Sequence, residues 1–326
     1  MKDITIIIPK IAILGSIEGP RQLFTQVNNF FIEKGRKPVF NIKLAGLTKE
    51  TPVSGGLYTV HADVLIKNLK KTDLIVIPAM DGDLMKAIEL NKDFIPWIKK
   101  LHASGAEIAS LCVGAFLLAA TGIMDGKKCA THWMAAGYFR KMFPDVDLVT
   151  EKIITDEAGI YTSGGAYSYL NLILYLIEKF SGREMAILCS KVFAIEIERS
   201  SQSPFSIFSG QKEHGDEPIK TAQDFIENNF QEKITVDMLA SLLVLGRRSF
   251  ERRFKEATKD TVKSYIQRVR IEFAKKCFET STKNINEVMY DTGYSDNKAF
   301  REIFKKLTGM SPLQYKSKYN TRFYSR

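Results

Sequence analysis

Two stretches decide the fold: SFERRFKEATKDTVKSY at residues 249–265 and AFREIFKKLTGMSPLQY at residues 299–315. They align at one constant offset, with identical residues at Phe250 and Phe300, Phe254 and Phe304, Lys255 and Lys305, Thr258 and Thr308, and Tyr265 and Tyr315. Each is preceded by a short helical pattern, TVDMLASLLVL (235–245) or INEVMYDTGY (285–294), and by turn residues, GRR or SDNK. A repeated helix, tight turn and helix predicts two helix-turn-helix units in an all-α region.

The second helix of each unit is predicted to bury one face and expose its first turn. The paired phenylalanines are four residues apart and therefore share a helix face. Polar and basic residues occupy the remaining surface, where such a helix meets the major groove of DNA. Asp296 is expected to cap the second of these helices, whereas Gly246 offers no side-chain acceptor to the first. The predicted DNA contacts are Arg247, Arg248, Ser249, Arg252, Asn297, Lys298 and Arg301.

A long helical pattern, TVKSYIQRVRIEFAKKCFET at 261–280, joins the two units. If this helix is rigid, it fixes the separation of the two recognition helices. One chain is then expected to read two major-groove segments about one DNA turn, roughly 34 Å, apart.

Positive charge is concentrated in the same region. Residues 216–326 contain 22 Lys and Arg against 15 Asp and Glu, a net charge of +7, whereas residues 1–215 contain 25 against 22, a net charge of +3. A basic domain favours a polyanion through phosphate neutralisation and counterion release. We therefore expect double-stranded DNA as the partner.

Residues 217–319 resemble the AraC/XylS family of transcriptional regulators. The second copy, INEVMYDTGYSDNKAFREIFKKLTGMSP, carries most of the resemblance, with Gly293 ending its first helix and TGMSP closing the motif. Two positions depart from the family pattern: the first copy has TKDTV (258–262) where a glycine and a proline are usual, and Glu302 stands where an arginine is common. A basic helical domain that binds only protein is the alternative interpretation.

The first 200 residues alternate short β-rich runs with longer helical patterns. The runs ITIIIP, PVFNIKLAG, TDLIVIPAM and EIASLC predict a parallel sheet flanked by helices, an α/β domain. A segment rich in Ser, Gly and Pro follows it and is typical of a linker. The predicted organisation is an α/β domain at 1–200, a linker at 201–216 and the DNA-binding domain at 217–326.

SLCVGAFLLAATGIMDGKKCATHW (110–133) and IYTSGGAYSYLNLILYLIEKFSG (160–182) resemble the ThiJ/PfpI group of the class I glutamine amidotransferase-like superfamily. The resemblance is greater to the variant of that domain that is fused to AraC-type modules. It implies a flavodoxin-like fold in which Cys112 lies at a sharp strand-to-helix turn. In the hydrolytic branch a histidine follows the nucleophile, and here that residue is Val113.

A cysteine nucleophile needs a base or a cationic neighbour, and the sequence offers no convincing one. His132, in the THW element, is expected to be structural or to line a pocket. Glu18, in GSIEGP, is expected in an early loop, where it either caps a helix from Pro20 onward or adjusts the reactivity of Cys112. We therefore predict a small-molecule pocket at Glu18, Cys112, Val113 and His132 rather than an active site. A cysteine-dependent hydrolase or glyoxal-handling enzyme, or a protein-interaction module without a ligand, remains as an alternative.

The remaining expectations concern location and partners. No apolar run approaches the roughly 18 residues of a membrane span, and MKDITIIIPK is too short a run for a signal peptide. The four cysteines have no metal-site spacing, so we expect no metal, cofactor or disulfide. The predicted protein is cytoplasmic, with a small-molecule effector, a homodimeric state and contact with RNA polymerase as further expectations.

Overall fold

Two parts of the chain fold around separate cores in a computed structural model that describes residues 1–197, 201–208, 210–212 and 214–320. The first unit is Met1–Gln202 and the second is Ser203–Arg326. The second unit starts within the segment predicted as a linker at 201–216. The predicted domain end at residue 200 lies outside the described residues, as do the last six residues of the predicted DNA-binding domain.

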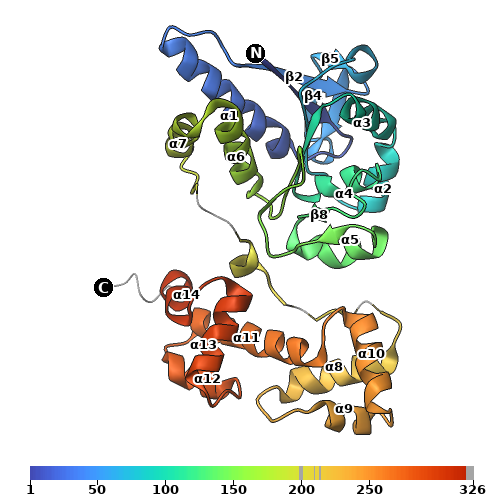
Figure 1. Cartoon of the computed structure of the whole chain (residues 1–326), viewed down its shortest axis with the longest axis vertical. Helices are drawn as coiled ribbons and strands as arrows, with labels where there is room; N and C mark the ends of the chain where they lie inside the picture. Colours follow the sequence, from blue (N-terminus) through green and yellow to red (C-terminus); the bar gives the residue numbers. More distant parts are fainter. Residues whose placement is uncertain (198–200, 209, 213, 321–326) are drawn as a thin grey trace. The chain divides into compact units, whose positions relative to one another are not determined.

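The first unit is built on a seven-stranded sheet in the order β10-β11-β7-β6-β1-β2-β5 (Figure 1). All neighbouring strands are parallel except β10, which pairs with β11 in the antiparallel direction. The strands are β1 (Lys2–Ile8), β2 (Phe40–Gly46), β5 (Val64–Leu65), β6 (Leu74–Ile77), β7 (Glu107–Leu111), β10 (Ile154–Asp156) and β11 (Ile160–Ser163). Two small strand pairs lie outside the sheet: β3 (Glu50–Val53) with β4 (Tyr58–His61), and β8 (Lys128–Cys129) with β9 (Asp147–Leu148).

Helices cover both faces of this sheet, as the α/β prediction required (Figure 1). One face is covered by α1 (Leu14–Glu33), α6 (Tyr169–Ser181) and α7 (Arg183–Val192), and the other by α2 (Leu84–Leu90), α3 (Phe94–Ala103), α4 (Ala115–Ala119) and α5 (Ala136–Met142). Alternate strand residues face opposite sides, so Ile6 and Ile8 enter one hydrophobic cluster and Ile7 enters the other. The strands β1, β6 and β7 are therefore buried on both faces, whereas β2 is half-buried over most of its length.

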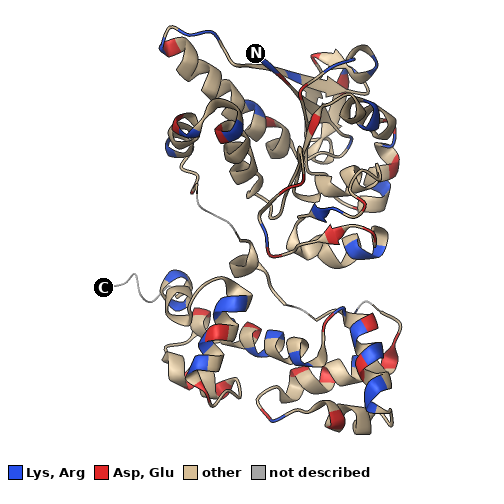
Figure 2. Ribbon diagram, viewed as in Figure 1, with Lys and Arg blue, Asp and Glu red and all other residues tan. Residues whose placement is uncertain are grey.

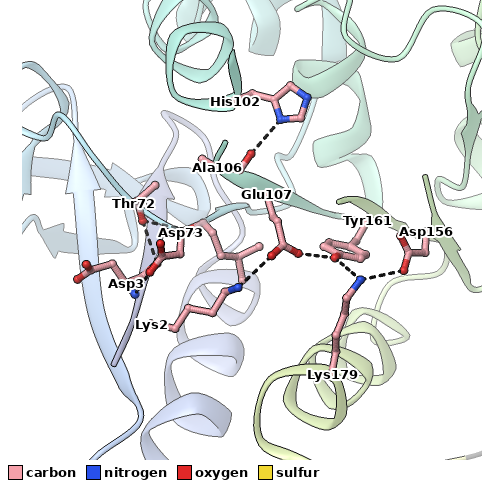
Figure 3. A network of polar contacts seen from close by, with 11 residues as sticks. Lys2, Asp3, Thr72, Asp73, His102, Ala106, Glu107, Asp156, Tyr161 and Lys179 are labelled. Atoms are coloured by element: carbon pink, nitrogen blue, oxygen red, sulfur yellow. Dashed lines mark hydrogen bonds and ion pairs between the residues drawn. The ribbon is translucent and has the colours of Figure 1, made fainter. Parts of the chain in front are cut away.

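A network of polar side chains lies at the amino ends of the parallel strands (Figure 3). Lys2 Nζ lies 2.9 Å from Glu107 Oε1, and the hydroxyl of Tyr161 donates to the other oxygen of Glu107. Lys179 Nζ donates to the Tyr161 oxygen at 2.6 Å and lies 3.3 Å from Asp156. Burial and the Glu107 carboxylate raise the pKa of Tyr161. This network joins β1, β7, β10, β11 and α6 at the sheet edge opposite the one where Cys112 lies.

The second unit is helical throughout its described residues, apart from turns and loops. After a short 3-10 turn at Ser203–Phe205 come α8 (Glu217–Asn229), α9 (Val236–Leu242), α10 (Arg247–Thr258), α11 (Val262–Thr280), α12 (Ile285–Asp291), α13 (Asn297–Thr308) and α14 (Pro312–Tyr319). They enclose two hydrophobic clusters. One contains Phe250, Phe254 and Tyr265, and the other contains Phe300 and Phe304 with residues of α11, α12 and α14. No helix among the described residues is long and apolar enough to cross a bilayer.

Candidate functional site

The turn of the first helix-turn-helix unit lies between α9 and α10. The amide of Leu245 donates to the carbonyl oxygen of Ala240 at 2.9 Å and closes the end of α9. Val244, in this turn, has a left-handed φ of 53° and a side chain that is 91% exposed. A β-branched residue rarely adopts this conformation. The first turn therefore holds backbone strain at an exposed position.

The second unit makes the same turn with glycine. The amide of Tyr294 donates to the carbonyl oxygen of Met289 at 3.2 Å, and Gly293 has a φ of 74°. A Cβ atom on Gly293 would lie 2.3 Å from the carbonyl oxygen of Gln231. Both the backbone conformation and the available space therefore require glycine here.

The two recognition helices, α10 and α13, bury the face that the sequence predicted. Phe250, Phe254, Phe300 and Phe304 are each 0% exposed. The capping prediction is also confirmed. Asp296 accepts a hydrogen bond from the Lys298 amide at 2.9 Å, whereas Gly246 makes no side-chain cap at the start of α10. A flanking side chain thus caps the first turn of α13 but not that of α10.

The predicted contact residues on α10 differ in the ion pairs that they already form. Arg247, the first residue of the helix, lies 3.0 Å from Asp237, and Arg252 lies 3.2 Å from Glu256. Arg248 is exposed, and Ser249 is half-buried. Figure 2 shows the basic residues along this helix. Because exposed ion pairs contribute little to stability, DNA phosphates would readily replace these partners.

On α13 the charged contact residues carry no ion pair among the described residues. Lys298 and Arg301 are exposed. Asn297 is half-buried, and its amide donates to Asn286 Oδ1 of α12 at 2.7 Å. Glu302, where the family pattern has an arginine, is exposed beside Arg301. The second recognition helix therefore presents fewer basic groups than the first.

The helix that joins the two units, α11, carries an arginine that the sequence did not single out. Arg270 donates to the carbonyl oxygens of Phe230 at 2.7 Å, Glu232 at 2.8 Å and Gly293 at 3.2 Å. It thereby ties the loop after α8 to the turn of the second unit. The 19 residues of α11 correspond to about 28 Å of helix. The predicted long connecting helix is confirmed.

Cys112 lies at the carboxyl end of β7, in the turn that leads into α4. It has a left-handed φ of 54° and is 5% exposed. Its amide donates to Ser163 Oγ at 3.3 Å, and its carbonyl oxygen accepts from Thr131 Oγ1 at 3.0 Å. Gly114 allows the tight turn, because a Cβ atom there would lie 2.6 Å from the carbonyl oxygen of Pro78. The predicted strand-to-helix turn is present.

The environment of the Cys112 thiol disfavours the thiolate. Burial raises the pKa of Cys112 to about 11, and a hydrogen bond from the Val113 backbone only partly opposes this effect. A reactive cysteine needs the opposite shift. Cys129 and Cys189 are also buried, and all four cysteines are free.

These two sites can now be compared with known proteins. A sequence model of the DJ-1/PfpI family matches residues 33–179, and a helix-turn-helix domain model of the AraC type matches residues 239–318. The chain is a DJ-1/PfpI domain fused to an AraC-type helix-turn-helix domain. The two expected resemblances are therefore confirmed.

Several relatives align with much of the chain. The HTH-type transcriptional regulator ArgR of Pseudomonas aeruginosa is 27% identical over 218 residues, which are 67% of this chain and 66% of ArgR. GbdR of the same species is 23% identical over 68% of this chain and 61% of its own length, and CdhR is 24% identical over 78% and 75%. The match to ArgR and GbdR thus spans less than two thirds of those relatives. A solved structure from Vibrio parahaemolyticus shares the fold of 59% of this chain and 98% of its own, with a TM-score of 0.53 and 21% identity.

Within the DJ-1/PfpI domain, the expectation that Glu18 lies in a loop is wrong. α1 begins at Leu14, so Glu18 is inside the helix. Its carboxylate accepts from Arg21 Nε at 2.6 Å and Nη2 at 2.7 Å, and this pairing lowers the pKa of Glu18. Among the described residues, no hydrogen bond or ion pair joins Glu18 to Cys112. The structure therefore does not bring these two predicted pocket residues together through a polar contact.

Among the described contacts, neither Val113 nor His132 supplies a base to Cys112. Val113 is half-buried and packs on the hydrophobic cluster around α3 to α5. His132 accepts from the Met134 amide at 3.2 Å and caps the short turn Trp133–Ala135. Burial lowers the pKa of His132, which favours the neutral ring. Its described contacts are those of a structural residue.

The sequence did not single out Tyr169, which lies near Cys112. Its hydroxyl donates to the carbonyl oxygen of Gly15 at 2.7 Å, and burial raises its pKa to about 12. A Cβ atom on Gly19 would lie 2.9 Å from this hydroxyl. The sequence signal that could have indicated this contact is the pair Gly15 and Gly19. Two glycines four residues apart share a helix face and let a large side chain approach the backbone.

Proposed function

We propose that this chain is a sequence-specific DNA-binding transcription regulator. The observation that carries the proposal is the duplicated helix-turn-helix unit, in which Arg248 and Lys298 occupy equivalent exposed positions in the first turns of α10 and α13. A rigid α11 between them suits two consecutive major-groove contacts on one face of DNA. The relatives that match both domains are named transcriptional regulators, which supports the same function.

The direct contacts in this proposal are Arg247, Arg248, Ser249 and Arg252 on α10 and Asn297, Lys298 and Arg301 on α13. Guanidinium, ammonium, amide and hydroxyl groups at the start of a recognition helix can donate to base edges or phosphates. Arg247 and Arg252 would exchange exposed acidic partners for DNA. Lys298 and Arg301 have no such partner to give up among the described residues.

We assign the DJ-1/PfpI domain a sensing or dimerising role in a cytoplasmic homodimer that acts through RNA polymerase. The effector site would lie at the carboxyl edge of the sheet around Cys112, Val113 and His132, where this class of sheet places ligands. Glu18 would belong to this effector site only if its ion pair with Arg21 were broken. A buried thiol with a raised pKa and a neutral, backbone-bonded histidine favour binding over cysteine catalysis.

The test is selection of double-stranded DNA from a random library by the full chain at physiological salt. Arg248→Ala/Lys298→Ala is compared with Lys255→Ala/Lys305→Ala, which removes the same charge from exposed equivalent positions nearer the ends of the two helices. We expect the wild type to recover sites with two half-sites about one turn apart. The first variant should bind them at least about 30-fold more weakly, and the matched control within about threefold of wild type.

Equal losses in the two double variants would mean that binding follows charge alone, and specific regulation would be rejected. Turnover of a carbonyl or amide substrate that Cys112→Ser abolishes would instead favour the enzyme alternative.

A further inference from the structure

The last residue of the first unit, Gln202, is held inside the DJ-1/PfpI domain. It is 1% exposed, and its amide nitrogen donates to the carbonyl oxygens of Thr131 at 3.0 Å and Lys152 at 3.2 Å. Its backbone amide donates to the carbonyl oxygen of Glu151 at 3.0 Å. Its side-chain oxygen is buried without a hydrogen-bond partner. A buried amide that is only partly satisfied at a chain junction is costly and calls for a functional explanation.

The loop after β11 is shaped to admit this side chain. A Cβ atom on Gly164 would lie 2.2 Å from Gln202 Nε2 and 2.9 Å from Oε1. Gly165 follows with a left-handed φ of 73°. A side chain at position 164 would therefore displace the amide group of Gln202.

The same loops reach the candidate effector site. Thr131, whose carbonyl oxygen holds Gln202, donates its hydroxyl to the carbonyl oxygen of Cys112 at 3.0 Å. Ser163, directly before Gly164, accepts from the Cys112 amide at 3.3 Å. Gln202 is thus connected to the backbone of Cys112 through one intervening residue.

Beyond Gln202, the chain is anchored at once to the helical unit. The turn Ser203–Phe205 packs on α13. Lys275 of α11, whose side chain is 6% exposed, donates to the carbonyl oxygen of Ser206 at 2.6 Å. The amide of Phe208 donates to Glu272 of α11 at 3.1 Å, and Asp216 forms two hydrogen bonds with Arg253 of α10. We call the described residues of 203–216, all but 209 and 213, the strap, and they contact both recognition helices and the helix between them.

We propose that Gln202 is the positioning residue through which occupation of the Cys112 site acts on the DNA-binding unit. This inference rests on the proposed function. An effector that moves Thr131 or the loop at 163–165 would change the hydrogen bonding and packing of the Gln202 side chain. Release of Gln202 removes a fixed point directly before the strap, and the strap in turn contacts α10, α11 and α13.

Two variants remove the hold on Gln202 by different means. Gln202→Ala deletes the side chain, whereas Gly164→Ala leaves it intact but places a methyl group where Nε2 lies. The control is Gln211→Ala, which removes another linker amide, one that donates to Asp260 within the helical unit at 3.3 Å. The readouts on the full chain are the rate of N-ethylmaleimide addition to Cys112, by peptide mass spectrometry, and hydrogen exchange of residues 203–208. Cys129 and Cys189, both 0% exposed, report any general loosening.

We expect both variants to raise Cys112 alkylation and strap exchange at least about fivefold, with Gln211→Ala at the wild-type rate for Cys112. In the double variant Gln202→Ala/Gly164→Ala the effects should not add, because the added methyl group then meets no side chain. Alkylation of Cys112 in the wild type should raise exchange of the strap, and in Gln202→Ala it should raise it no further.

Unchanged Cys112 and strap rates in both variants would overturn the proposal, as would equal acceleration at Cys129 and Cys189. Because these assays contain no DNA, their outcome does not depend on whether the proposed DNA-binding function is correct. If the variants change Cys112 and strap rates but the chain selects no specific DNA, the proposed regulator function is rejected and the role of Gln202 stands. If the chain selects specific DNA but the rates do not change, the function stands and the role of Gln202 is rejected.

Discussion

In the second helix-turn-helix unit glycine occupies both left-handed positions, Gly293 after α12 and Gly309 after α13, each with a φ of 74°. In the first unit the same two positions hold Val244 with a φ of 53° and Lys259 with a φ of 61°. Non-glycine residues in this region carry strain of roughly 1 kcal/mol or more. The same fold is thus built once with the favoured residues and once without them.

The helix starts differ in the same direction. α12 begins with a capping box between Asn284 and Glu287, and Asp296 caps α13. In the first unit Thr235 caps α9 alone, and Gly246 gives α10 no side-chain cap. The second unit is therefore stabilised by its own local sequence to a greater extent than the first.

Non-local contacts hold the first unit. Arg253 of α10 pairs with Asp216 of the strap, and Phe208 of the strap packs on Tyr265 with ring centroids 5.1 Å apart. In the second unit the position of Arg253 is taken by Ile303, which packs on the hydrophobic cluster of that unit. The first recognition helix therefore forms an ion pair with the strap, whereas the second packs on the strap at Ser203–Phe205 and carries a side-chain cap of its own.

The largest expected effect is at the glycine of the second turn. Gly293→Ala places Cβ 2.3 Å from the carbonyl oxygen of Gln231 and also strains φ. We expect the free energy of unfolding of the helical unit to fall by about 3 kcal/mol, measured by urea denaturation. Gly246→Ala is the control, because a Cβ atom there would meet no atom within 4 Å and φ is −67°. A loss below about 1 kcal/mol for Gly293→Ala would show that the turn can rearrange.

The next effect concerns the strap and depends on pH. Hydrogen bonds from Arg253 lower the pKa of Asp216 below its ordinary value of 3.8. Because the folded pKa is the lower one, the stabilisation is fully present above the ordinary value and is lost as pH falls through the folded pKa. Asp216 also caps α8 by accepting a hydrogen bond from the Ile219 amide at 3.3 Å. Asp216→Ala should therefore cost about 1 kcal/mol near pH 7 for loss of this cap alone.

Asp216→Asn separates charge from capping, since asparagine also caps helices. Its stability should fall below that of the wild type at neutral pH, and the difference should close on acidification below the ordinary pKa of aspartate. A difference that stays constant even well below that pH would contradict a role for the ion pair with Arg253. Parallel urea titrations at several pH values measure it.

The smallest effect should be a gain. Val244→Gly relieves the left-handed strain, loses almost no packing because the side chain is 91% exposed, and adds flexibility to the unfolded chain. The net result should be a stabilisation of about 0.5 kcal/mol. Val244→Thr keeps the β-branched shape and should leave stability unchanged. A loss of stability in Val244→Gly would mean that the valine makes the first turn more stable than its glycine counterpart.

Periodic features of the sequence predicted the two helix-turn-helix units well. The spacing of Phe250, Phe254, Phe300 and Phe304 fixed their shared faces, and the β-rich runs became buried parallel strands. Such features work because side-chain period and secondary structure are linked directly.

Features set by tertiary contacts were not predictable in the same way. The family resemblance placed Glu18 of GSIEGP in an early loop, yet it lies in α1, where Tyr169 packs closely on Gly15 and Gly19. The serine-rich segment indicated a flexible linker, but from Ser203 onward it belongs to the second unit. The raised pKa of Cys112 follows from burial, which no local pattern around the cysteine reports.

The position of α11 has a consequence for how the helical unit unfolds. Tyr265 near the start of this helix belongs to the first hydrophobic cluster, and Phe278 near its end belongs to the second. Fraying of α11 at either end would therefore expose one hydrophobic cluster and weaken the helix on which the other cluster also packs. We therefore expect the helical unit to melt in one cooperative transition rather than two.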